Sequence, residues 1–463
     1  MTRSRRPRPR RWALTALLLC AGCVSYEPAP RALGDVLTEL EAIRLPHQET
    51  IVPIGSSSWT RFDAQDGLTV VEAAAAAVRL NPALAAARAE VDLRDAQLVE
   101  AGLLPDITLG WESGNNVADF ITDRRSSANS YLAGFFLEWP VPRPGEIDAR
   151  EGVARAERAQ ARARVLAAEW ALVREVHEAY VALLAARVRT QQTERLVSIA
   201  GKSFDYLGRA RGLGAATALD ENLARVTAAA ARADALAAER EEQLARQRLN
   251  GLLGVAPDAA WAPQTALSEL EGGSALAARE AEALARRALE RRPDLREAQA
   301  RYDEAEELLR LEVARQWPQV SIGTGISLTL ACFSRFNRPA IRSAARARDL
   351  AGRRLALAVQ GVRVEVHAAL ADYRQSERAL RLFREEVEPA LAESLRLTER
   401  AFEAREVTPL QILAAQQQVI EARARALDAQ RRRALARVRL EAATGDLLPR
   451  LRTRYPDDEG GSR

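Results

Sequence analysis

Three cysteines are the most reactive side chains in this sequence, and their spacing limits what they can do. Cys20 and Cys23 lie near the N-terminus, and Cys332 lies far along the chain. Three cysteines placed in this way form neither a disulfide framework nor a cysteine-based zinc site. A cysteine that follows small residues near the N-terminus can instead accept a lipid, which makes Cys23 the candidate for covalent modification.

The segment before Cys23 has the order of an export signal. Six arginines lie within residues 3–11, an apolar run follows over residues 12–19, and Ala21-Gly22 stand directly before Cys23. This order predicts a bacterial export signal peptide over residues 1–22, because the apolar run is far shorter than the roughly 20 residues of a membrane-spanning helix. The segment resembles a lipoprotein signal in which Cys23 carries the lipid (palmitate). An ordinary cleaved signal with incidental cysteines is the alternative.

The rest of the sequence offers no catalytic constellation. Gly323-Thr324-Gly325 lacks the third glycine and the following helix of a phosphate loop, and we find no serine nucleophile elbow, paired-histidine zinc motif or P-loop. His177 and His367 fall at equivalent places in two repeats and could form a metal ring in an oligomer. Because ligating histidines usually come in clusters, a polar helix face is the favoured interpretation. We therefore predict no enzyme activity, no cofactor and no resident metal.

The composition is that of long helices. Of the 463 residues, 48% are hydrophobic, 28% are charged and only 5% are aromatic, as in chains built from alanine, leucine, arginine and glutamate. The formal net charge of +4 falls to about −2 once the six N-terminal arginines are removed, which excludes a nucleic-acid partner. Beyond the signal, no apolar stretch reaches the roughly 18 residues of a membrane helix. Crossing a membrane would therefore require strands in a closed barrel.

Two segments alternate apolar and polar residues with the period of a β-strand. Residues 107–112 and 131–139 carry this alternation, and a polar, turn-rich loop separates them. The pattern predicts a β-hairpin over residues 106–139 that ends at Pro140. The polar positions that would line a water-filled lumen are Thr108, Glu112 and Glu138.

Two long helices follow this hairpin. Residues 148–211 contain no proline and repeat apolar residues at helical spacing, which predicts a helix of about 95 Å at 1.5 Å per residue. Glycines at 212 and 214 end it, and a second helix is predicted from about Thr217 to Leu253, before Gly254. Two helices joined by a short turn form an α-hairpin.

The same plan occurs twice in the chain. Both halves contain two matching dipeptides that end in proline and mark helix boundaries. They are Asn81-Pro82 and Leu104-Pro105 in the first half, and Arg292-Pro293 and Trp317-Pro318 in the second. We assign one repeat to residues 67–254 and the other to residues 281–447, joined by a linker over residues 255–280. The second hairpin, residues 319–333, leaves about seven residues per strand, against the 9–11 that a tilted membrane strand needs.

The segments outside the repeats have a different composition. Residues 23–66 hold several prolines and a run of serines, which predicts an extended N-terminal arm suited to a lipid anchor. Residues 448–463 are predicted to be a disordered C-terminal tail.

A geometric argument points to self-association. Each half supplies one hairpin, so one chain contributes about four strands, whereas known transmembrane barrels have at least eight. One chain cannot close its own pore. Alanine-rich helices suit the same purpose, because small side chains let many helices pack side by side into a wide wall.

At this point the residues resemble a known family. Asn81-Pro82-Ala83-Leu84 with Leu104-Pro105-Asp106, repeated as Arg292-Pro293-Asp294-Leu295 with Trp317-Pro318, is similar to the TolC-type outer-membrane efflux proteins. The resemblance implies a mainly α fold with a small β part: the protomer of a homotrimer with a 12-stranded transmembrane β-barrel and a periplasmic α-barrel. It also implies an outer-membrane exit duct of a tripartite efflux system, lipid-anchored and docked on a periplasmic adaptor and an inner-membrane pump, for which an RND-type is expected.

The resemblance also implies docking sites at the tips of the helical hairpins. Carried over by motif, the adaptor would grip Gly212, Leu213, Gly214 and Thr217 at the first tip, and Val407, Thr408, Pro409 and Leu410 at the second. A plain helix–helix turn is the alternative, since glycine is expected there for its backbone freedom. The segments 139–142 and 333–338 resemble the heavy-metal-efflux branch, the CzcC-like proteins.

Two other functions stay open. The same body could serve as the exit duct of type I protein secretion, and the sequence does not separate the two. A structural, non-conducting coiled-coil lipoprotein would explain the helices and the anchor, but not the alternating segments at 107–112 and 131–139.

Overall fold

The structure is a computed structural model that describes residues 26–45, 49–51, 60–62, 67–115, 131–271, 274–323, 326–330, 335–403 and 409–447. The chain divides into two compact units, residues 1–43 and 44–463. The predicted signal over residues 1–22, the lipidation candidate Cys23 and the tail over residues 448–463 lie outside the described residues. The same holds for Val407 and Thr408 at the second helical tip.

The N-terminal arm departs from its prediction. We expected an extended segment over residues 23–66, but the first unit contains helix α2 (Leu33–Ala42). The helix forms because this stretch has no proline between Pro30 and Pro46, and because Asp35 lies in its first turn, where a negative charge stabilises a helix. In the second unit, two short strands pair antiparallel, β1 (Glu49–Ile51) and β2 (Thr60–Phe62).

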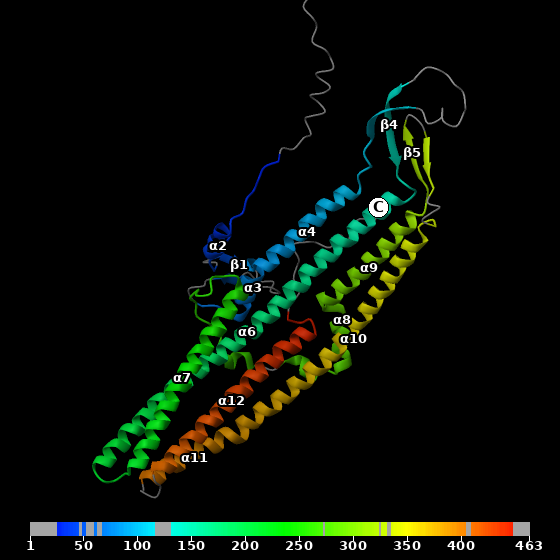
Figure 1. The fold of residues 1–463 in the computed structure, drawn as a ribbon. Coiled ribbons are helices and arrows are strands. Elements are labelled where there is room, and N and C mark those ends of the chain that lie inside the picture. The colour runs from blue at the N-terminus through cyan, green and yellow to red at the C-terminus, as the bar shows by residue number, and fades with distance from the viewer. Residues whose placement is uncertain are drawn as a thin grey trace, which may run out of the picture. The chain divides into compact units, whose positions relative to one another are not determined.

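The second unit contains the two halves of a duplication (Figure 1). The elements of the first half are α3 (Val70–Leu80), α4 (Pro82–Ala101), β3 (Thr108–Asn115), β4 (Tyr131–Val141), α6 (Glu146–Gly212) and α7 (Ala218–Leu253). Those of the second are α8 (Ala281–Arg291), α9 (Pro293–Ala314), β5 (Gln319–Gly323), β6 (Ile326–Thr329), α10 (Arg338–Leu382), a π-helical segment (Phe383–Val387), α11 (Glu388–Glu403) and α12 (Pro409–Ala443). The predicted fold class, a repeated helix, β-hairpin and long α-hairpin, is confirmed.

The residue before the shared proline has the same task in both halves. Asn81 caps α4 by accepting hydrogen bonds from amides of its first turn, and Pro82 begins the helix, where a missing N–H costs nothing. The Asn81 side chain also donates to the Leu252 carbonyl, at 2.9 Å, near the end of α7. Arg292, at the matching place before α9, donates to the Ala443 carbonyl at the end of α12, at 3.3 Å. Each half is therefore closed by a tie between its short helices and its last helix.

Two glycines allow this closure. Gly254 and Gly445 follow α7 and α12 with φ values of 77° and 72°, in the left-handed region that glycine adopts at no steric cost. A Cβ at Gly254 would lie 2.7 Å from the Leu80 carbonyl oxygen, and one at Gly445 would lie 2.8 Å from Arg291 Cβ. In both halves the last helix therefore ends against the turn between the two short helices.

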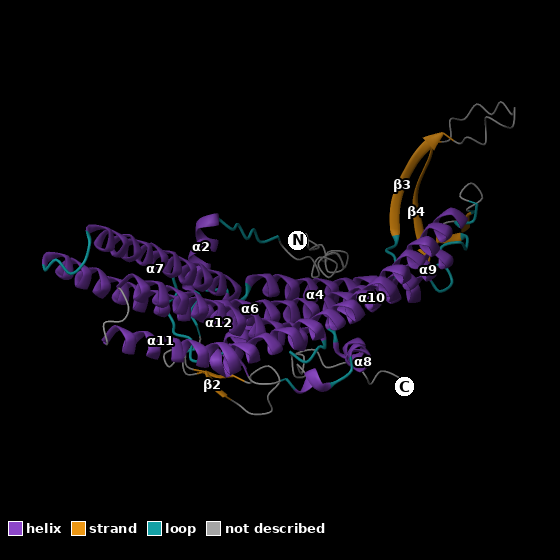
Figure 2. Cartoon of the chain, turned by 90° about the horizontal axis from the view of Figure 1, so that it is seen from below, coloured by secondary structure: helices purple, strands orange, loops and turns teal. Residues whose placement is uncertain are grey.

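The helices of the second unit form a layer with two open edges (Figure 2). Nearer the strands the order is α4, α6, α9 and α10, and nearer the helical tips it is α7, α6, α12 and α10. Apolar contacts hold the layer together. One hydrophobic core joins α8, α10 and α12. The central members of that core are Val366, Leu370, Tyr373 and Leu440. The repeat 1 edge is thus α4 and α7, and the repeat 2 edge is α10.

The strands form one antiparallel sheet in the order β3-β4-β5-β6. Each helix of the strand-proximal layer adjoins one strand in the chain, since α4 leads to β3, β4 to α6, α9 to β5 and β6 to α10. The sheet joins the two halves by pairing β4 with β5 in the register Trp139↔Ile322. Within the described residues, β3 and β6 each pair on one side only, so the sheet has the same two open edges as the layer.

Two details of the hairpins differ from the prediction. Pro140 does not end the second strand, because β4 continues to Val141 and pairs Pro140 with Ser321. β3 begins opposite Glu138 and pairs with no residue of β4 beyond it, so Pro140 lies at a sheet edge on that side, where proline is tolerated. The second hairpin, expected over residues 319–333, has strands of five and four residues, shorter than the seven we expected. Its predicted turn at residues 324–325 lies outside the described residues.

Among the described residues, no single helix has the length and apolar composition to cross a membrane. Helices α3 and α4 pass that criterion only as a pair, bent by 48°.

Candidate functional site

The four-stranded sheet has one apolar face and one polar face. Over residues 108–109, 137–141, 319–323 and 326–329, the register places residues of like character opposite one another. The apolar face carries Leu109, Leu137, Trp139, Val141, Val320, Ile322, Ile326 and Leu328. The other face carries Thr108, Glu138, Pro140, Gln319, Ser321, Gly323, Ser327 and Thr329. Such alternation is the pattern of a strand that has lipid on one side and water on the other.

The apolar face is uncovered in the protomer. Leu109 is 70% exposed and Ile326 is 81% exposed, and Leu137, Ile322 and Leu328 are exposed as well. Apolar side chains in this number on one face of a sheet normally pack against a second layer or contact lipid. No described element covers this face, so it is available to a membrane.

The polar face contains two of the three positions predicted to line a lumen. Thr108 and Glu138 are direct cross-strand partners, and both are exposed. The side chain of Glu112 lies outside the described part of the chain, although its backbone pairs with Gly134. The polar face continues into β5 and β6 through Ser321 and Ser327.

Gly323 allows β4 and β5 to pair closely. A Cβ at Gly323 would lie 1.6 Å from the Leu137 carbonyl oxygen and 2.6 Å from its carbon. Atoms cannot approach to these distances, so any side chain at this position would push the two strands apart. The contact between the hairpins of the two halves therefore depends on a residue without a Cβ.

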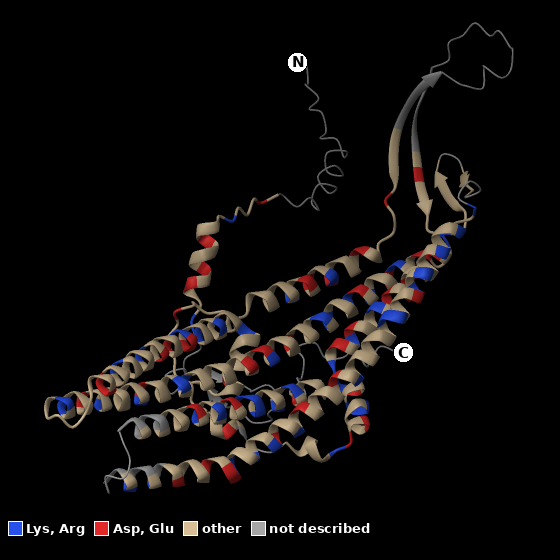
Figure 3. Cartoon of the chain, turned by 60° about the horizontal axis from the view of Figure 1, so that its bottom comes forward, with Lys and Arg blue, Asp and Glu red and all other residues tan. Residues whose placement is uncertain are grey.

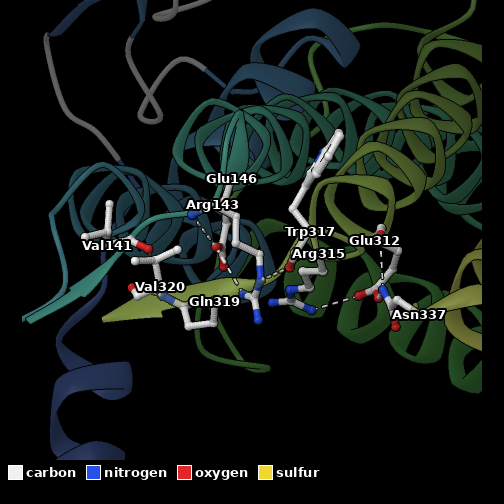
Figure 4. A network of polar contacts seen from close by, with 9 residues as sticks. All are labelled: Val141, Arg143, Glu146, Glu312, Arg315, Trp317, Gln319, Val320 and Asn337. Carbon is white, nitrogen blue, oxygen red and sulfur yellow. Dashed lines mark hydrogen bonds and ion pairs between the residues drawn. The ribbon is translucent and has the colours of Figure 1, made fainter. Parts of the chain in front are cut away.

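A polar network joins the strands to the helices (Figure 4). Arg143, between β4 and α6, donates to the Trp317 carbonyl at 2.9 Å and to Glu146 at 3.2 Å. Gln319 at the start of β5 donates to the Val141 carbonyl at 2.7 Å. These bonds tie the connection β4–α6 of one half to the connection α9–β5 of the other.

The start of α10 completes the network. Asn337, before the first turn, donates to both the carbonyl and the carboxylate of Glu312, each at 2.8 Å. Glu312 also accepts from Arg315 at 2.7 Å. Phe336 and Trp317 are exposed beside these groups, and aromatic side chains next to cations are typical of the boundary between membrane and water.

The first helical tip is a capped turn. Thr217 and Asp220 form a reciprocal capping box at the start of α7, which lowers the pKa of Asp220 by hydrogen bonds to its carboxylate. Gly214 adopts a φ of 73°, and Leu213 is 85% exposed. An ion pair between Arg211 and Glu221 links the two helices across the turn. The tip thus presents exposed apolar side chains, Leu213 and Leu219, on a fixed backbone.

The second tip is described only from Pro409 onward. Pro409 is the first residue of α12 and Leu410 the second, whereas Val407 and Thr408 lie outside the described residues. The side chains of Pro409 and Leu410 are likewise not described, so the structure leaves this docking site as a sequence-based expectation.

The two histidines that match in sequence lie in different surroundings. His177 is half-buried between α6 and α12, where burial and the charge of Arg437 lower its pKa to about 4. His367 on α10 is exposed, with its Nε2 3.9 Å from Glu282. Among the described residues, no group of three or more histidine, cysteine or acidic side chains could hold a metal ion.

The sequence reading missed the open edges of the helical layer. On α10 a 3–4 spacing runs through exposed positions, namely Ala347, Leu350, Arg354, Leu357, Gly361 and Val364. On α7 the same spacing runs through Leu219, Leu223, Val226, Ala230, Ala233, Ala237, Arg240 and Leu244, all exposed. We call each of these two rows of exposed residues a seam. The signal in the sequence is heptad spacing on a second face of each helix, because residues with that spacing normally pack against another helix.

Comparison with known proteins gives a family match. The sequence matches the model of the outer membrane efflux protein family over residues 74–255 and 321–446, more than half of the chain. It is 27% identical over 264 residues to the cobalt-zinc-cadmium resistance protein CzcC of Cupriavidus metallidurans. That stretch covers 57% of this chain and 59% of CzcC, so the chain spans less than two thirds of this curated relative.

Solved structures share the fold. The MtrE outer membrane channel of Neisseria gonorrhoeae in its open state is similar with a TM-score of 0.66 and 19% identity, over 88% of this chain and 98% of that one. The outer membrane protein VceC of Vibrio cholerae is similar with a TM-score of 0.66 and 17% identity, over 81% of this chain and 96% of that one.

Proposed function

The chain belongs to the outer membrane efflux protein family, and we propose that three copies of it form the outer-membrane exit duct of a tripartite efflux system. In this proposal the sheet lies in the outer membrane, the helices extend into the periplasm, and Cys23 carries a lipid anchor. The duct conducts passively and catalyses no reaction.

One observation carries the proposal: a two-faced sheet and a helical layer end at the same two edges. Within the part of the chain that the structure describes, no element covers the apolar face of the sheet, and β3 and β6 each have backbone groups without a strand partner on one side. In lipid each unpaired backbone group costs several kcal/mol, which only a closed sheet avoids. Because β3 and β6 belong to different halves, closure requires the β3 edge of one copy to pair with the β6 edge of the next. Three copies of a four-stranded sheet would give the 12 strands that the family resemblance implies.

The helical seams support the same arrangement. The exposed seam of α7 and that of α10 lie on opposite edges of the layer. In a head-to-tail ring the α10 seam would pack against α4 of the next copy, and the α7 seam, which lies beside the tip-proximal part of α6, would pack against the tip-proximal end of the repeat 2 edge. Small residues such as Ala230, Ala233 and Gly361 would let the helices approach closely.

We place adaptor docking at the helical tips. Leu213 is 85% exposed on a capped turn, more than the neighbouring Leu219 at 66%, and it is flanked by Gly212 and Gly214. We expect Leu213→Asp to leave the trimer and its conductance intact but to weaken binding of the periplasmic adaptor. Leu308→Asp makes the same change at an exposed position of α9, distant from the tip, and should leave adaptor binding unchanged.

The relative CzcC is named for resistance to cobalt, zinc and cadmium, which supports divalent metal cations as the first substrate class to test. An RND-type pump as the inner-membrane partner remains the expectation from the family resemblance. The duct needs no metal ligands for this role, because the adaptor and pump would select the substrate. Deletion of the gene should raise sensitivity to these metals; sensitivity only to dyes or detergents would contradict the metal assignment.

Reconstitution tests the duct itself. Purified protein in a planar lipid bilayer should give discrete conductance steps, and unboiled samples should migrate as a trimer on a denaturing gel. A well-folded protein that remains monomeric and gives no steps would refute the proposal and favour a structural coiled-coil lipoprotein.

A further inference from the structure

We propose that ion pairs between the outward face of α4 in one copy and the outward face of α10 in the next set the register of the ring. The inference rests on the proposed function, because it requires copies that meet edge to edge. The occupant of each face is a second copy of this chain.

The outward face of α4 is acidic. Asp92 and Glu100 are exposed there, and within the described residues neither carboxylate has a partner. The two arginines of α4 turn the other way, since Arg88 bonds Glu169 of α6 at 2.6 Å and Arg94 bonds Glu157 at 2.9 Å. Between the acids lie small and apolar residues such as Leu93, so the face is apolar with negative charge only.

The outward face of α10 is basic. Arg353 and Arg354 are exposed and have no ion-pair partner in the described part of the chain. Arg346 reaches only Asp349 on its own helix, at 3.7 Å, and remains 87% exposed. These arginines stand in and beside the apolar seam that contains Leu357. The two faces therefore combine apolar residues with opposite charge, which favours association and fixes register. Figure 3 marks the acidic and basic positions along the helices.

Contacts across the layer show which residues of α4 and α10 stand at the same level. Near the strands, a Cβ at Gly102 would lie 2.9 Å from Glu151 of α6. The next residue of α6 would meet Glu307 of α9 in the same way. The residue before Glu307 pairs with Arg348 of α10 at 3.6 Å. Gly102 and Arg348 therefore stand on one line across the layer.

A second line crosses the layer further from the strands. Glu90 of α4 pairs with Arg164 of α6 at 3.0 Å, and Arg164 reaches Glu297 of α9 at 3.6 Å. Tyr302 lies beside Gly352 of α10, 3.5 Å from the position of a Cβ there. Because α9 and α10 are antiparallel, Glu297 is level with a residue about one turn beyond Gly352.

These two lines bring acids and arginines to similar levels. With a rise of 1.5 Å per residue, Glu100 lies about 5 Å from the level of Arg346, and Asp92 lies within about 4 Å of the levels of Arg353 and Arg354. Rotation about the axis of a ring does not move a residue along that axis. The α4 edge of one copy therefore meets the α10 edge of the next at the same level, and each acid faces an arginine.

A membrane surface is the other conceivable partner for exposed arginines, but the level of these residues disfavours it. Arg353 lies 15 residues into α10, which places it about 22 Å from the start of the helix. The headgroup region adds only about 5–8 Å on each side of the hydrocarbon core. Arg353 and Arg354 are thus too far from the sheet to reach phosphates of the bilayer in which the sheet would lie.

Charge reversal tests the inference on the full-length protein in detergent. Asp92→Arg alone, and Arg353→Glu with Arg354→Glu, should each lower the trimer association constant about tenfold, because a closed ring carries the change at all three interfaces. Combining the reversals should restore most of the loss. Arg310→Glu, which reverses an exposed arginine on α9 inside the layer, should leave the trimer unchanged.

The outcomes separate this inference from the proposed function. If the unchanged protein forms no trimer, the proposed function fails. If it forms a trimer and the reversals are silent, or the combination gives no rescue, only the α4–α10 pairing is wrong. Binding to vesicles that contain phosphatidylglycerol provides a further readout, since reversals that weaken this binding but leave the trimer intact would assign the arginines to lipid. Circular dichroism checks that each variant folds.

A direct proximity test needs no charge argument. In a Cys332→Ser background, Asp92→Cys with Arg354→Cys should form disulfide-linked dimers and trimers on mild oxidation. Asp92→Cys with Arg310→Cys should not. Equal cross-linking of both pairs, or of neither in a conducting trimer, would overturn the inference.

Discussion

The two halves of the chain share their closures and differ in their strands and long helices. In the first half the strands have eight and 11 residues and α6 runs without a break for 67 residues. In the second the strands have five and four residues, and a π-helical segment separates α10 from α11. The two halves therefore share the contacts that close each half at the end of its last helix, and they differ in the strands and in the long helices.

The π-helical segment has a simple origin in the sequence. His177 and His367 are 190 positions apart, whereas Gly254 and Gly445 are 191 apart. The second half thus contains one additional residue between these landmarks. A π-helical turn accommodates one inserted residue in an α-helix, and Phe383–Val387 lies in this interval. The comparison teaches that an insertion can be absorbed locally while the closure beyond it is maintained.

The largest expected effect lies where the sheets of the two halves meet. Gly323→Ala would place a Cβ against the Leu137 carbonyl, which must separate β4 from β5, so we expect loss of the trimer that resists detergent on unboiled gels. Gly201→Ala on α6 is the matched control, because nothing lies within 4 Å of its Cβ position. A Gly323→Ala trimer with normal heat-modifiable mobility would show that the halves do not depend on this contact.

The next effect compares the residues before the shared prolines. Arg292 is buried, pairs with Asp294 and Glu365, and stacks on the Trp170 ring at 4.7 Å. Arg292→Ala should lower the free energy of unfolding by about 1.5–3 kcal/mol, because it removes a buried guanidinium whose charge-assisted hydrogen bonds reach two carboxylates that are themselves more than a third exposed. Asn81→Ala loses mainly a helix cap and should cost about 1 kcal/mol. Denaturant titration measures both, and equal losses would mean that the two closures are equivalent in energy.

The histidines provide a pH-dependent comparison. The pKa of His177 falls to about 4 in the folded protein, from an ordinary value of 6.5, so between these values the unfolded state binds more protons. Stability should be complete above pH 6.5 and decrease as the pH falls toward 4, by at most about 3 kcal/mol. His177→Gln should flatten this slope in denaturant titrations. The exposed His367→Gln is the control, and a slope unchanged in His177→Gln would contradict the assignment.

The smallest effect concerns the closing glycines. Gly254→Ala and Gly445→Ala each force a Cβ into the left-handed region and should cost about 1–3 kcal/mol. Gly254→Ala should be the worse, because all three atoms nearest its Cβ belong to backbone. Thermal unfolding compares the two variants directly. A larger loss for Gly445→Ala would mean that the turn after α3 can move more easily than the turn after α8.

Much of the fold could be predicted because the residues that end helices and the alternation that marks strands are local signals. Proline and glycine at helix ends, and the alternation over residues 107–112 and 131–139, are signals that a few neighbouring residues determine. The helix predicted over residues 148–211 is α6, at Glu146–Gly212. The prediction for Pro140 is wrong because its place at a sheet edge depends on where β3 begins, which the sequence near Pro140 does not show.

The site was only partly predictable for the same reason. The polar positions Thr108 and Glu138 followed from alternation, but the pairing of β4 with β5 joins residues about 180 positions apart. The exposed seams were hidden because α7 and α10 are apolar on more than one face, and only the packing shows which face stays open. Helix α2 was missed because the surrounding prolines masked a short stretch without any.

Accessibility of the two faces of β6 tests the central claim most directly. In a Cys332→Ser background, Ser327→Cys places a thiol on the polar face and Leu328→Cys places one on the apolar face. A charged, membrane-impermeant thiol reagent should lower the single-channel conductance of the Ser327→Cys trimer and leave that of Leu328→Cys unchanged. Block of Leu328→Cys with no effect on Ser327→Cys would contradict an aqueous duct lined by the polar face of this sheet.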